Sequence, residues 1–331
     1  MKSVGVIGAG SWGTALAKHL ADNGHKVSVY SAIASEIDML KEHHEQKEKL
    51  PGVMLPDDMV FTTDIGEAVR NKDILVLAVP SPFTRTTAGS MKDVVSDGQI
   101  IVSVAKGLED ESFCTLSEII KQEIPQCRVV VLCGPTHAEE VGKGVPTAIV
   151  AGSSDLTDAK IVQDIFMSDN FRVYTSDDPY GMELGGALKN VIALAAGIAD
   201  GLGYGDNTKA ALITRGIHEI ARLGVAAGGK RDTFEGLTGI GDLIVTCASM
   251  HSRNRRAGIL IGQGKSADEA MAEVKQIVEG VHSAKAAVHF AEKYGVPMPI
   301  IEQVNLILFE GKKPEEALKD LMTRDKKPEA V

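Results

Sequence analysis

A glycine-rich turn near the start of the chain constrains the fold more than any other feature. Gly8, Gly10 and Gly13 follow the apolar run at residues 4–7 directly and lead into a segment rich in alanine and leucine. In a strand–turn–helix unit the first glycine permits the tight turn and the second lets a pyrophosphate approach the backbone. The third lets helix and strand pack closely. A plain turn is the alternative interpretation, but the strand before it and the helix after it favour dinucleotide binding.

Short apolar runs alternate with amphipathic stretches up to about residue 175. The runs are β-branched and nearly continuous, which is typical of strands buried on both faces of a parallel sheet. This alternation predicts a doubly wound α/β domain of the Rossmann type, with helices at residues 14–23, 65–71 and 113–123. The predicted strands cover residues 4–7, 26–30, 74–79, 100–104, 129–132, 147–150 and 172–174, and we expect mixed pairing for the last two.

The pattern changes after Asp178 and Pro179, where helical periodicity replaces the apolar runs. We therefore predict a dinucleotide-binding domain at residues 1–178, an all-helical substrate domain at 179–323 and a loose tail at 324–331. Asn207 and Thr208 offer a cap for the second helix, and Pro314 suits a first helical turn. The predicted helices cover residues 183–199, 208–223, 266–275, 283–294, 300–309 and 314–321.

Charge and composition exclude several classes of protein. The net charge of -10 argues against nucleic-acid binding and against docking on anionic membranes. The four cysteines lack the spacing of a zinc site or a redox pair, so we expect free, mostly buried thiols. The apolar run at residues 191–199 is too short to span a bilayer, and no signal peptide precedes the first strand. We expect a cytoplasmic protein without integral membrane association, in which the polar residues 42–49 form a solvated helix or loop.

The end of the second predicted strand bears on the choice of cofactor. Tyr30, Ser31 and Ala32 stand where an NAD-selective site usually has an acid that holds the ribose 2′-hydroxyl. Glu36 comes later, in what the pattern predicts to be the next helix, and no arginine is present to select NADP firmly. Ser31 can hydrogen-bond either ribose form. The sequence therefore favours NADP or the use of both cofactors.

Two lysines and an acid are candidates for the chemistry. Lys106 and the pair Gly134 and Thr136 each follow a predicted strand, and ligands in open α/β sheets lie outside the carboxyl ends of strands. Lys189 lies in an apolar helix, where burial lowers a lysine pKa and suits it to proton transfer. Asp242 is its candidate partner. The alternatives are a solvent-facing Lys106, a Lys189 whose stem only covers its helix, and an Asp242 that caps residues 243–247.

A third group stands shortly after this acid. Ser252, Arg253 and Asn254 supply a hydroxyl, a guanidinium and an amide consecutively, which is a suitable set for clamping an anion, most naturally a phosphate. A solvated basic loop is the alternative, and it stays the interpretation for Arg255 and Arg256. A carboxylate would satisfy the same clamp, so a hydroxy-acid oxidoreductase remains a rival. A non-catalytic protein that binds or senses a nucleotide is a second rival interpretation.

Taken together, these motifs resemble the bacterial NAD(P)-dependent sn-glycerol-3-phosphate dehydrogenases over nearly the whole chain. The resemblance implies a Rossmann domain followed by a helical domain like that of 6-phosphogluconate dehydrogenase, in a homodimer. It also implies reversible reduction of dihydroxyacetone phosphate to sn-glycerol 3-phosphate with NAD(P)H, which supplies phospholipid synthesis, and no metal. The matching segments are residues 8–13, 50–52, 105–107, 134–138, 188–190, 207–216, 239–242, 252–255 and 278–280.

Roles for single residues follow from the same resemblance. Lys189 is implied as the proton acceptor, with Asp242 and Lys106 beside it in catalysis. The implied substrate contacts are Lys106, Gly134, Thr136, Lys189, Asp242, Ser252, Arg253 and Asn254. The implied cofactor contacts are Ser11, Trp12, Lys106, Ala138, Arg253 and Glu279. The predicted cofactor site also includes Gly8, Gly10 and Gly13 of the glycine turn, Ser31 and Val278. Members of the family often carry Arg or His where this chain has Ser31 and Ala32, which affects the cofactor preference but not the reaction.

Overall fold

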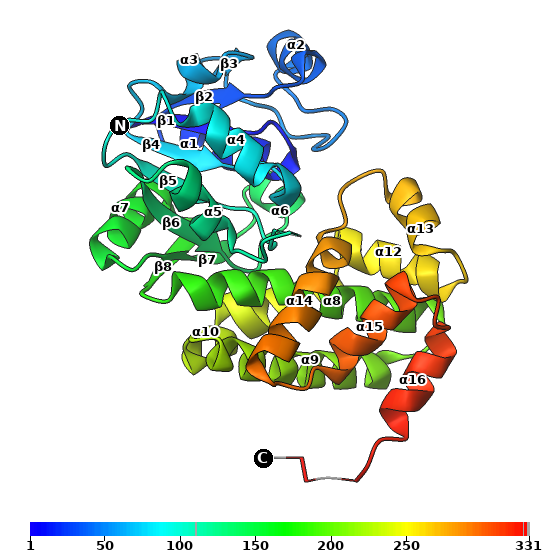
Figure 1. Cartoon of the computed structure of the whole chain (residues 1–331). Helices are drawn as coiled ribbons and strands as arrows, with labels where there is room; N and C mark the ends of the chain where they lie inside the picture. The colour runs from blue at the N-terminus through cyan, green and yellow to red at the C-terminus, as the bar shows by residue number, and fades with distance from the viewer. Residues whose placement is uncertain (110, 327, 330–331) are drawn as a thin grey trace.

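One eight-stranded sheet forms the N-terminal part of the molecule, in the order β3-β2-β1-β4-β5-β6-β7-β8. The computed structural model describes residues 1–109, 111–326, 328 and 329 (Figure 1). Neighbouring strands are parallel except for β6 and β7, so the predicted Rossmann-type sheet with mixed pairing at one edge is confirmed. The strands are β1 (Ser3–Ile7), β2 (Lys26–Tyr30), β3 (Val60–Thr62), β4 (Ile74–Leu77), β5 (Ile100–Ser103), β6 (Arg128–Cys133), β7 (Thr147–Gly152) and β8 (Phe171–Ser176).

Both faces of this sheet are buried, as its continuous apolar runs require. In β4, Val76 packs into the core on one face while Leu75 and Leu77 pack into the core on the other. Short helices cover the sheet between its strands. They are α1 (Ser11–Asp22), α2 (Ala34–His43), α3 (Ile65–Val69), η1 (Ser81–Phe83), α4 (Thr84–Met91), α5 (Leu116–Glu123), α6 (Ala138–Gly142) and α7 (Leu156–Phe166).

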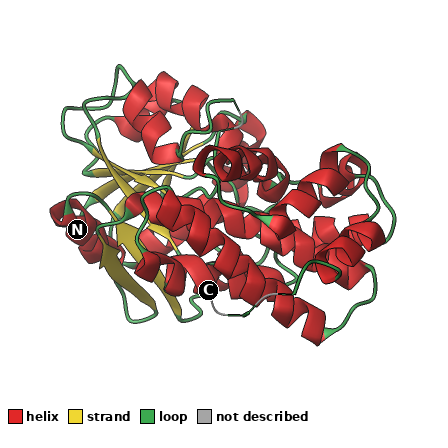
Figure 2. Ribbon diagram, turned by 60° about the horizontal axis from the view of Figure 1, so that its bottom comes forward, coloured by secondary structure: helices red, strands yellow, loops and turns green. Residues whose placement is uncertain are grey.

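Helices alone make up the second part, and Figure 2 shows them on one side of the molecule with the strands on the other. Their core surrounds α8, in which residues 181–199 are all buried. The helices are α8 (Pro179–Gly201), α9 (Asp206–Ala226), α10 (Arg231–Glu235), the π-helix η2 (Leu237–Gly241), α11 (Asp242–Ala248), α12 (Arg253–Gly262), α13 (Ala267–Val274), α14 (Glu279–Tyr294), α15 (Pro299–Phe309) and α16 (Pro314–Met322).

Glycines bring α8 and α12 into backbone contact. A Cβ atom added at Gly197 would lie 2.1 Å from the carbonyl oxygen of Arg255, and one added at Gly258 would lie 2.2 Å from that of Leu194. Only glycine, whose side chain is a hydrogen atom, lets the backbones of the two helices approach so closely. As a result, the first turn of α12, which carries Arg253, is held against the helix that carries Lys189.

Several local predictions need correction. The strand β3 was not predicted, because three residues are too short for a period-2 pattern to stand out. Helix α9 begins at Asp206 with Gly205 as its N-cap, so Asn207 and Thr208 do not cap it. Within residues 42–49, Gln46 is fully buried rather than solvated. Pro314 does open α16, as predicted.

By length and composition alone, helix α8 is long and apolar enough to cross a membrane. The sequence pattern had indicated only the shorter apolar run at residues 191–199. The apolar window of α8, however, is completely buried inside the protein. Such a helix is expected at the centre of a helical domain, where every face meets other helices.

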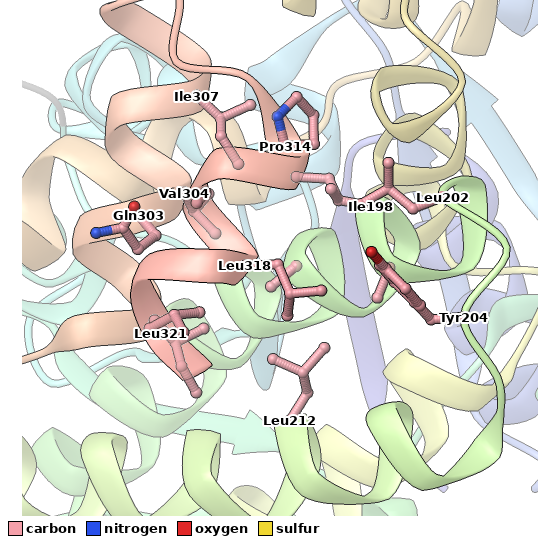
Figure 3. Close-up of a pocket in the computed structure, with 14 residues that line it drawn as sticks. Ile198, Leu202, Tyr204, Leu212, Gln303, Val304, Ile307, Pro314, Leu318 and Leu321 are labelled. Carbon is pink, nitrogen blue, oxygen red and sulfur yellow. The ribbon is translucent and has the colours of Figure 1, made fainter. Parts of the chain in front are cut away.

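An apolar pocket of about 40 Å³ lies between α8, α9, α15 and α16 (Figure 3). Apart from Tyr204 and Gln303 its lining is aliphatic, and it includes Leu212 and Leu318. Ligand sites usually enclose roughly 300–1,000 Å³. This pocket is therefore a packing gap beneath α16 and not a substrate site.

Candidate active site

One buried carboxylate lies between two lysines at the junction of the two parts. Asp242, which is 1% exposed, accepts from Lys106 Nζ at 2.7 Å through Oδ2 and from Lys189 Nζ at 3.1 Å through Oδ1. Lys106 follows β5, Lys189 comes from the middle of α8, and Asp242 begins α11. The structure thus joins the three residues that the sequence singled out for chemistry. One carboxylate for two ammonium groups leaves the cluster with surplus positive charge.

A π-helix places Asp242 at this point. The π-helix η2 (Leu237–Gly241) ends directly before Asp242, and such single turns occur frequently at functional sites. Gly239 makes the turn possible, because an added Cβ atom would lie 2.0 Å from the carbonyl oxygen of Phe234. Asp242 therefore belongs to the first turn of α11 but uses its carboxylate to bind lysines instead of capping the helix.

The three charges in this cluster affect one another. Burial alone would raise the pKa of Asp242, but Lys106 and Lys189 outweigh burial and lower it. Burial lowers the pKa of Lys189, and the neighbouring Lys106 lowers it further against the opposing effect of Asp242. For Lys106 the contact with Asp242 outweighs burial and raises the pKa. Lys189 is therefore the lysine that gives up a proton more readily.

The two lysines also differ in how many of their hydrogen-bond donors are used within the protein. Lys106 Nζ donates to the Gly134 carbonyl at 2.8 Å and to Thr136 Oγ1 at 3.4 Å, which together with Asp242 occupies all three donors. Lys189 Nζ donates to Thr246 Oγ1 at 2.7 Å and to Asp242. Among the described residues no third acceptor meets Lys189, so one of its donors is left for a ligand.

Thr246 is a site residue that the sequence reasoning missed. Its hydroxyl accepts from Lys189 and donates to the Asp242 carbonyl at 2.6 Å, one turn earlier on α11. A threonine one helical turn after a buried acid is the available signal. Nothing in the sequence alone shows that a lysine from α8 reaches it.

Arg253 is the unpaired cation of the site. It opens α12, and among the described residues none hydrogen-bonds or ion-pairs with its guanidinium. Burial lowers its pKa, and the negative charge of Glu279 opposes this effect. A partly buried guanidinium with unused donors is suited to a phosphate or carboxylate ligand.

The two neighbours of Arg253 form hydrogen bonds within the protein. Ser252 caps α12, since its Oγ accepts from the Arg255 amide at 3.2 Å. Asn254 donates to Asn190 Oδ1 at 2.9 Å and accepts from the Gly280 amide at 2.8 Å. Both side chains fix the frame around Arg253, and their contact with substrate stays a prediction.

The glycine turn fits a dinucleotide phosphate. Gly8 has a φ of 124°, and a Cβ atom on Gly13 would lie 2.1 Å from the Gly8 carbonyl oxygen, so both positions require glycine. An added Cβ atom on Gly10 would meet nothing within 4 Å, so the backbone there faces open space. Helix α1 begins at Ser11 without a side-chain cap and without an acid in its first turn, so its free amides can bind an anion.

The other predicted cofactor contacts lie around this turn or at the domain junction. Trp12 packs against the sheet core, and Ala138 begins α6, which contacts α1. Val278 is buried at the start of α14. Glu279 accepts from the Ser81 amide at 3.1 Å and from the Ser81 hydroxyl, which ties α14 to the segment after β4.

The end of β2 differs from the expectation in one respect. Ser31 Oγ donates to Glu36 Oε2 at 2.6 Å, so the first turn of α2 returns an acid to the place where none was predicted. Lys49 donates to the other oxygen of Glu36. The position of Glu36 in the sequence did not predict this contact, because the fold of the segment after β2 brings its carboxylate back to Ser31.

Two more residues near the site had not been assigned roles. Gln46 Nε2 donates to the Ala9 carbonyl at 3.0 Å and so braces the glycine turn. His137 has a buried Nε2 that no described residue hydrogen-bonds, and burial, together with the charges of Lys189 and Lys106, lowers its pKa. His137 belongs to the segment 134–138 that carried the resemblance, but its side chain had no predicted function.

The remaining titratable groups provide little for a metal or a thiol reaction. Among the described residues no group of three or more His, Cys, Asp or Glu side chains lies close enough to hold a metal ion. All four cysteines are free, as predicted, and three are buried. Burial raises the pKa of Cys133, which lies beside Asp242, to about 11, so its thiol is protonated at neutral pH.

Comparison with known proteins agrees with this geometry. Residues 3–159 match the family model for the N-terminus of NAD-dependent glycerol-3-phosphate dehydrogenase, and residues 178–319 match the model for its C-terminus. The glycerol-3-phosphate dehydrogenase (NAD(P)+) of Agathobacter rectalis is 64% identical over 99% of this chain and 98% of its own. That of Fusobacterium nucleatum is 59% identical over 99% of both.

A solved structure extends the agreement to three dimensions. The crystal structure of glycerol-3-phosphate dehydrogenase from Coxiella burnetii superposes with a TM-score of 0.94 at 35% sequence identity. The match covers 98% of this chain and 99% of that one. The chain belongs to the NAD-dependent glycerol-3-phosphate dehydrogenase family.

Proposed function

We propose that this protein is an NAD(P)H-dependent oxidoreductase that reduces dihydroxyacetone phosphate to sn-glycerol 3-phosphate, reversibly. The observation that carries the proposal is the shared carboxylate of Asp242 between Lys106 and Lys189, with unpaired Arg253 on the adjoining helix. Relatives named glycerol-3-phosphate dehydrogenase (NAD(P)+) support the same reaction. The cofactor supplies a hydride to the substrate carbonyl carbon when it is bound.

The glycine turn holds the pyrophosphate of the cofactor. Gly10 offers open backbone, and the uncapped amides of α1 next to it are suited to negative charge. Ser11, Trp12, Ala138, Val278 and Glu279 are assigned to the same cofactor site as proposals.

Lys189 donates or accepts the proton of the reaction. As an ammonium it donates to the substrate oxygen that becomes the alkoxide, and in the opposite direction the free amine accepts that proton. Thr246 and Asp242 hold Lys189 Nζ in place, which leaves one N–H direction for the substrate. Because burial and the neighbouring Lys106 lower the pKa of Lys189, its ammonium gives up a proton more readily than an ordinary lysine does.

Lys106 and Arg253 supply positive charge in this proposal. Lys106 stays protonated beside Asp242 and keeps the cluster cationic, while it fixes the Gly134 and Thr136 segment. Arg253 binds the substrate phosphate. We also assign the protein to the cytoplasm and to a homodimer, in line with the resemblance.

The phosphate assignment is tested with a matched pair of substrates. Arg253→Ala is expected to raise the KM for dihydroxyacetone phosphate roughly tenfold to a hundredfold, because a charged hydrogen bond contributes about 1.5–3 kcal/mol. The slow turnover of unphosphorylated dihydroxyacetone should not change. Arg231→Ala, which alters a surface arginine paired with Glu235, is the control. Equal turnover of both substrates by the wild-type enzyme would overturn the proposal.

A further inference from the structure

An ion pair of Glu36 and Lys49 lies beside Ser31 at the end of β2. Ser31 and Glu36 are each 6% exposed, and Ser31 Oγ donates to Glu36 Oε2 at 2.6 Å. Lys49 donates to Glu36 Oε1, with 37% of its side chain exposed. The acid is thus buried, and the cation that neutralises it lies on its solvent side.

This ion pair is fixed to the glycine turn. The Gly8 amide donates to the Tyr30 carbonyl at 2.8 Å, which ties the end of β2 to the start of the turn. Gln46, three residues before Lys49, is fully buried and donates to the Ala9 carbonyl at 3.0 Å. Leu50, directly after Lys49, is also fully buried. Lys49 therefore stands on an anchored segment rather than on a free loop.

The position of the pair indicates its ligand. In dinucleotide-binding sheets an acid near the end of the second strand binds the ribose 2′-hydroxyl, whereas a cation accommodates a 2′-phosphate. An unpaired carboxylate there repels a phosphate, and an unpaired cation attracts one. Here both groups are present and neutralise each other.

We infer that the Glu36–Lys49 pair sets the choice between the two cofactors. Glu36, held by Ser31, accepts from the 2′-hydroxyl of NAD(H), and Lys49 binds the 2′-phosphate of NADP(H). Because the pair is neutral, neither cofactor is rejected, and the wild-type site binds both. This inference rests on the proposed dinucleotide-dependent function, since it assigns the ribose end of that cofactor.

Fluorescence titration of NADH and of NADPH with the full-length protein measures the two affinities without turnover. Lys49→Met should weaken NADPH binding roughly tenfold to a hundredfold, because a charged contact is lost and Glu36 is left unpaired. NADH binding should stay unchanged. Lys49→Arg should retain NADPH binding, and Lys47→Met, which removes an exposed cation from the same segment, should leave both affinities unchanged.

The variant Glu36→Gln tests the other contact in the inference, that of Glu36 with NADH. It should weaken NADH binding and leave NADPH binding equal or stronger, because Lys49 then acts without a competing carboxylate. A thermal melt of each variant shows whether the fold is retained, and the half-exposed Lys49 variants decide the question if Glu36→Gln does not fold. Equal changes for both cofactors in Lys49→Met would overturn the inference. A wild-type protein that binds neither cofactor would instead overturn the proposed function.

Discussion

Two buried carboxylates lie beside helix α8, and their pKa values are shifted in opposite directions. Asp242 is 1% exposed and Glu183 is 5% exposed, so burial is nearly the same. Burial raises the pKa of Glu183 to about 7, and the hydrogen bonds from the neutral amide and hydroxyl of Ser117 only partly offset this rise. At Asp242 burial acts in the same direction, but two lysines reverse its effect. Whether a buried acid belongs to a reactive cluster or only connects parts of the structure therefore depends on the groups that it binds, and not on its burial.

Glu183 connects α5 to the first turns of α8 and carries no charge partner among the described residues. Asp242 binds Lys106 through one carboxylate oxygen and Lys189 through the other, and Lys189 keeps a donor for a ligand. The same helix therefore carries a structural group near its start and a reactive one near its middle.

Removal of the reactive amine should have the largest effect. Lys189→Met is expected to lower kcat roughly 10²- to 10⁴-fold, the range for loss of a general acid–base group. NADH binding, measured by fluorescence, should persist because the glycine turn is untouched. Near-normal turnover in this variant would remove Lys189 from the proton-transfer role.

Loss of the central carboxylate should mainly affect stability. Asp242→Asn leaves Lys106 and Lys189 buried without their counter-ion, which costs about 3–5 kcal/mol in comparable cases. Urea unfolding at pH 8 measures this loss. Glu183→Gln at the same pH serves as the contrast and should cost little, because no cation loses a partner. Equal destabilisation by the two variants would contradict the distinction between these carboxylates.

The raised pKa of Glu183 predicts a smaller, pH-dependent effect. Because its folded-state pKa of about 7 lies above the ordinary value of 4.5, the folded protein binds the proton more tightly. Stability from this group is therefore present at low pH and is lost as the pH rises from 4.5 to 7, by up to about 3 kcal/mol. Unfolding free energies at pH 5 and pH 7.5 should show this fall in the wild type and a smaller one in Glu183→Gln. Glu219, whose pKa burial also raises to about 7, contributes to the fall that remains.

Sequence patterns predicted the fold well where residue types alone determine it. The run at residues 26–30 is β-branched and apolar, and β2 (Lys26–Tyr30) has those bounds. By contrast, β3 has only three residues, which are too few for a strand pattern to stand out in the sequence. Helix α12 was hidden because its basic start resembles a loop.

The site was predictable to the extent that its residues are unusual for their surroundings. Lys189 in an apolar helix and Asp242 before an apolar run were both out of place, which made their pairing a reasonable hypothesis. Thr246, Glu36 and Gln46 are ordinary surface-type residues, and only the tertiary fold brings them to the site. The same reason explains why the hydrogen bonds that Ser252 and Asn254 form within the protein were not predicted, and the contact of these two residues with substrate stays a prediction.

In the proposed mechanism, Asp242 and Lys106 together set the proton affinity of Lys189. In the reductive direction kcat requires the Lys189 ammonium, so log kcat plotted against pH has an alkaline limb that reports its pKa. Asp242 raises and Lys106 lowers that pKa, so Asp242→Asn should move the limb to lower pH and Lys106→Met should move it to higher pH. Limbs that stay at the wild-type position in both variants, or that move in the same direction, would contradict the account.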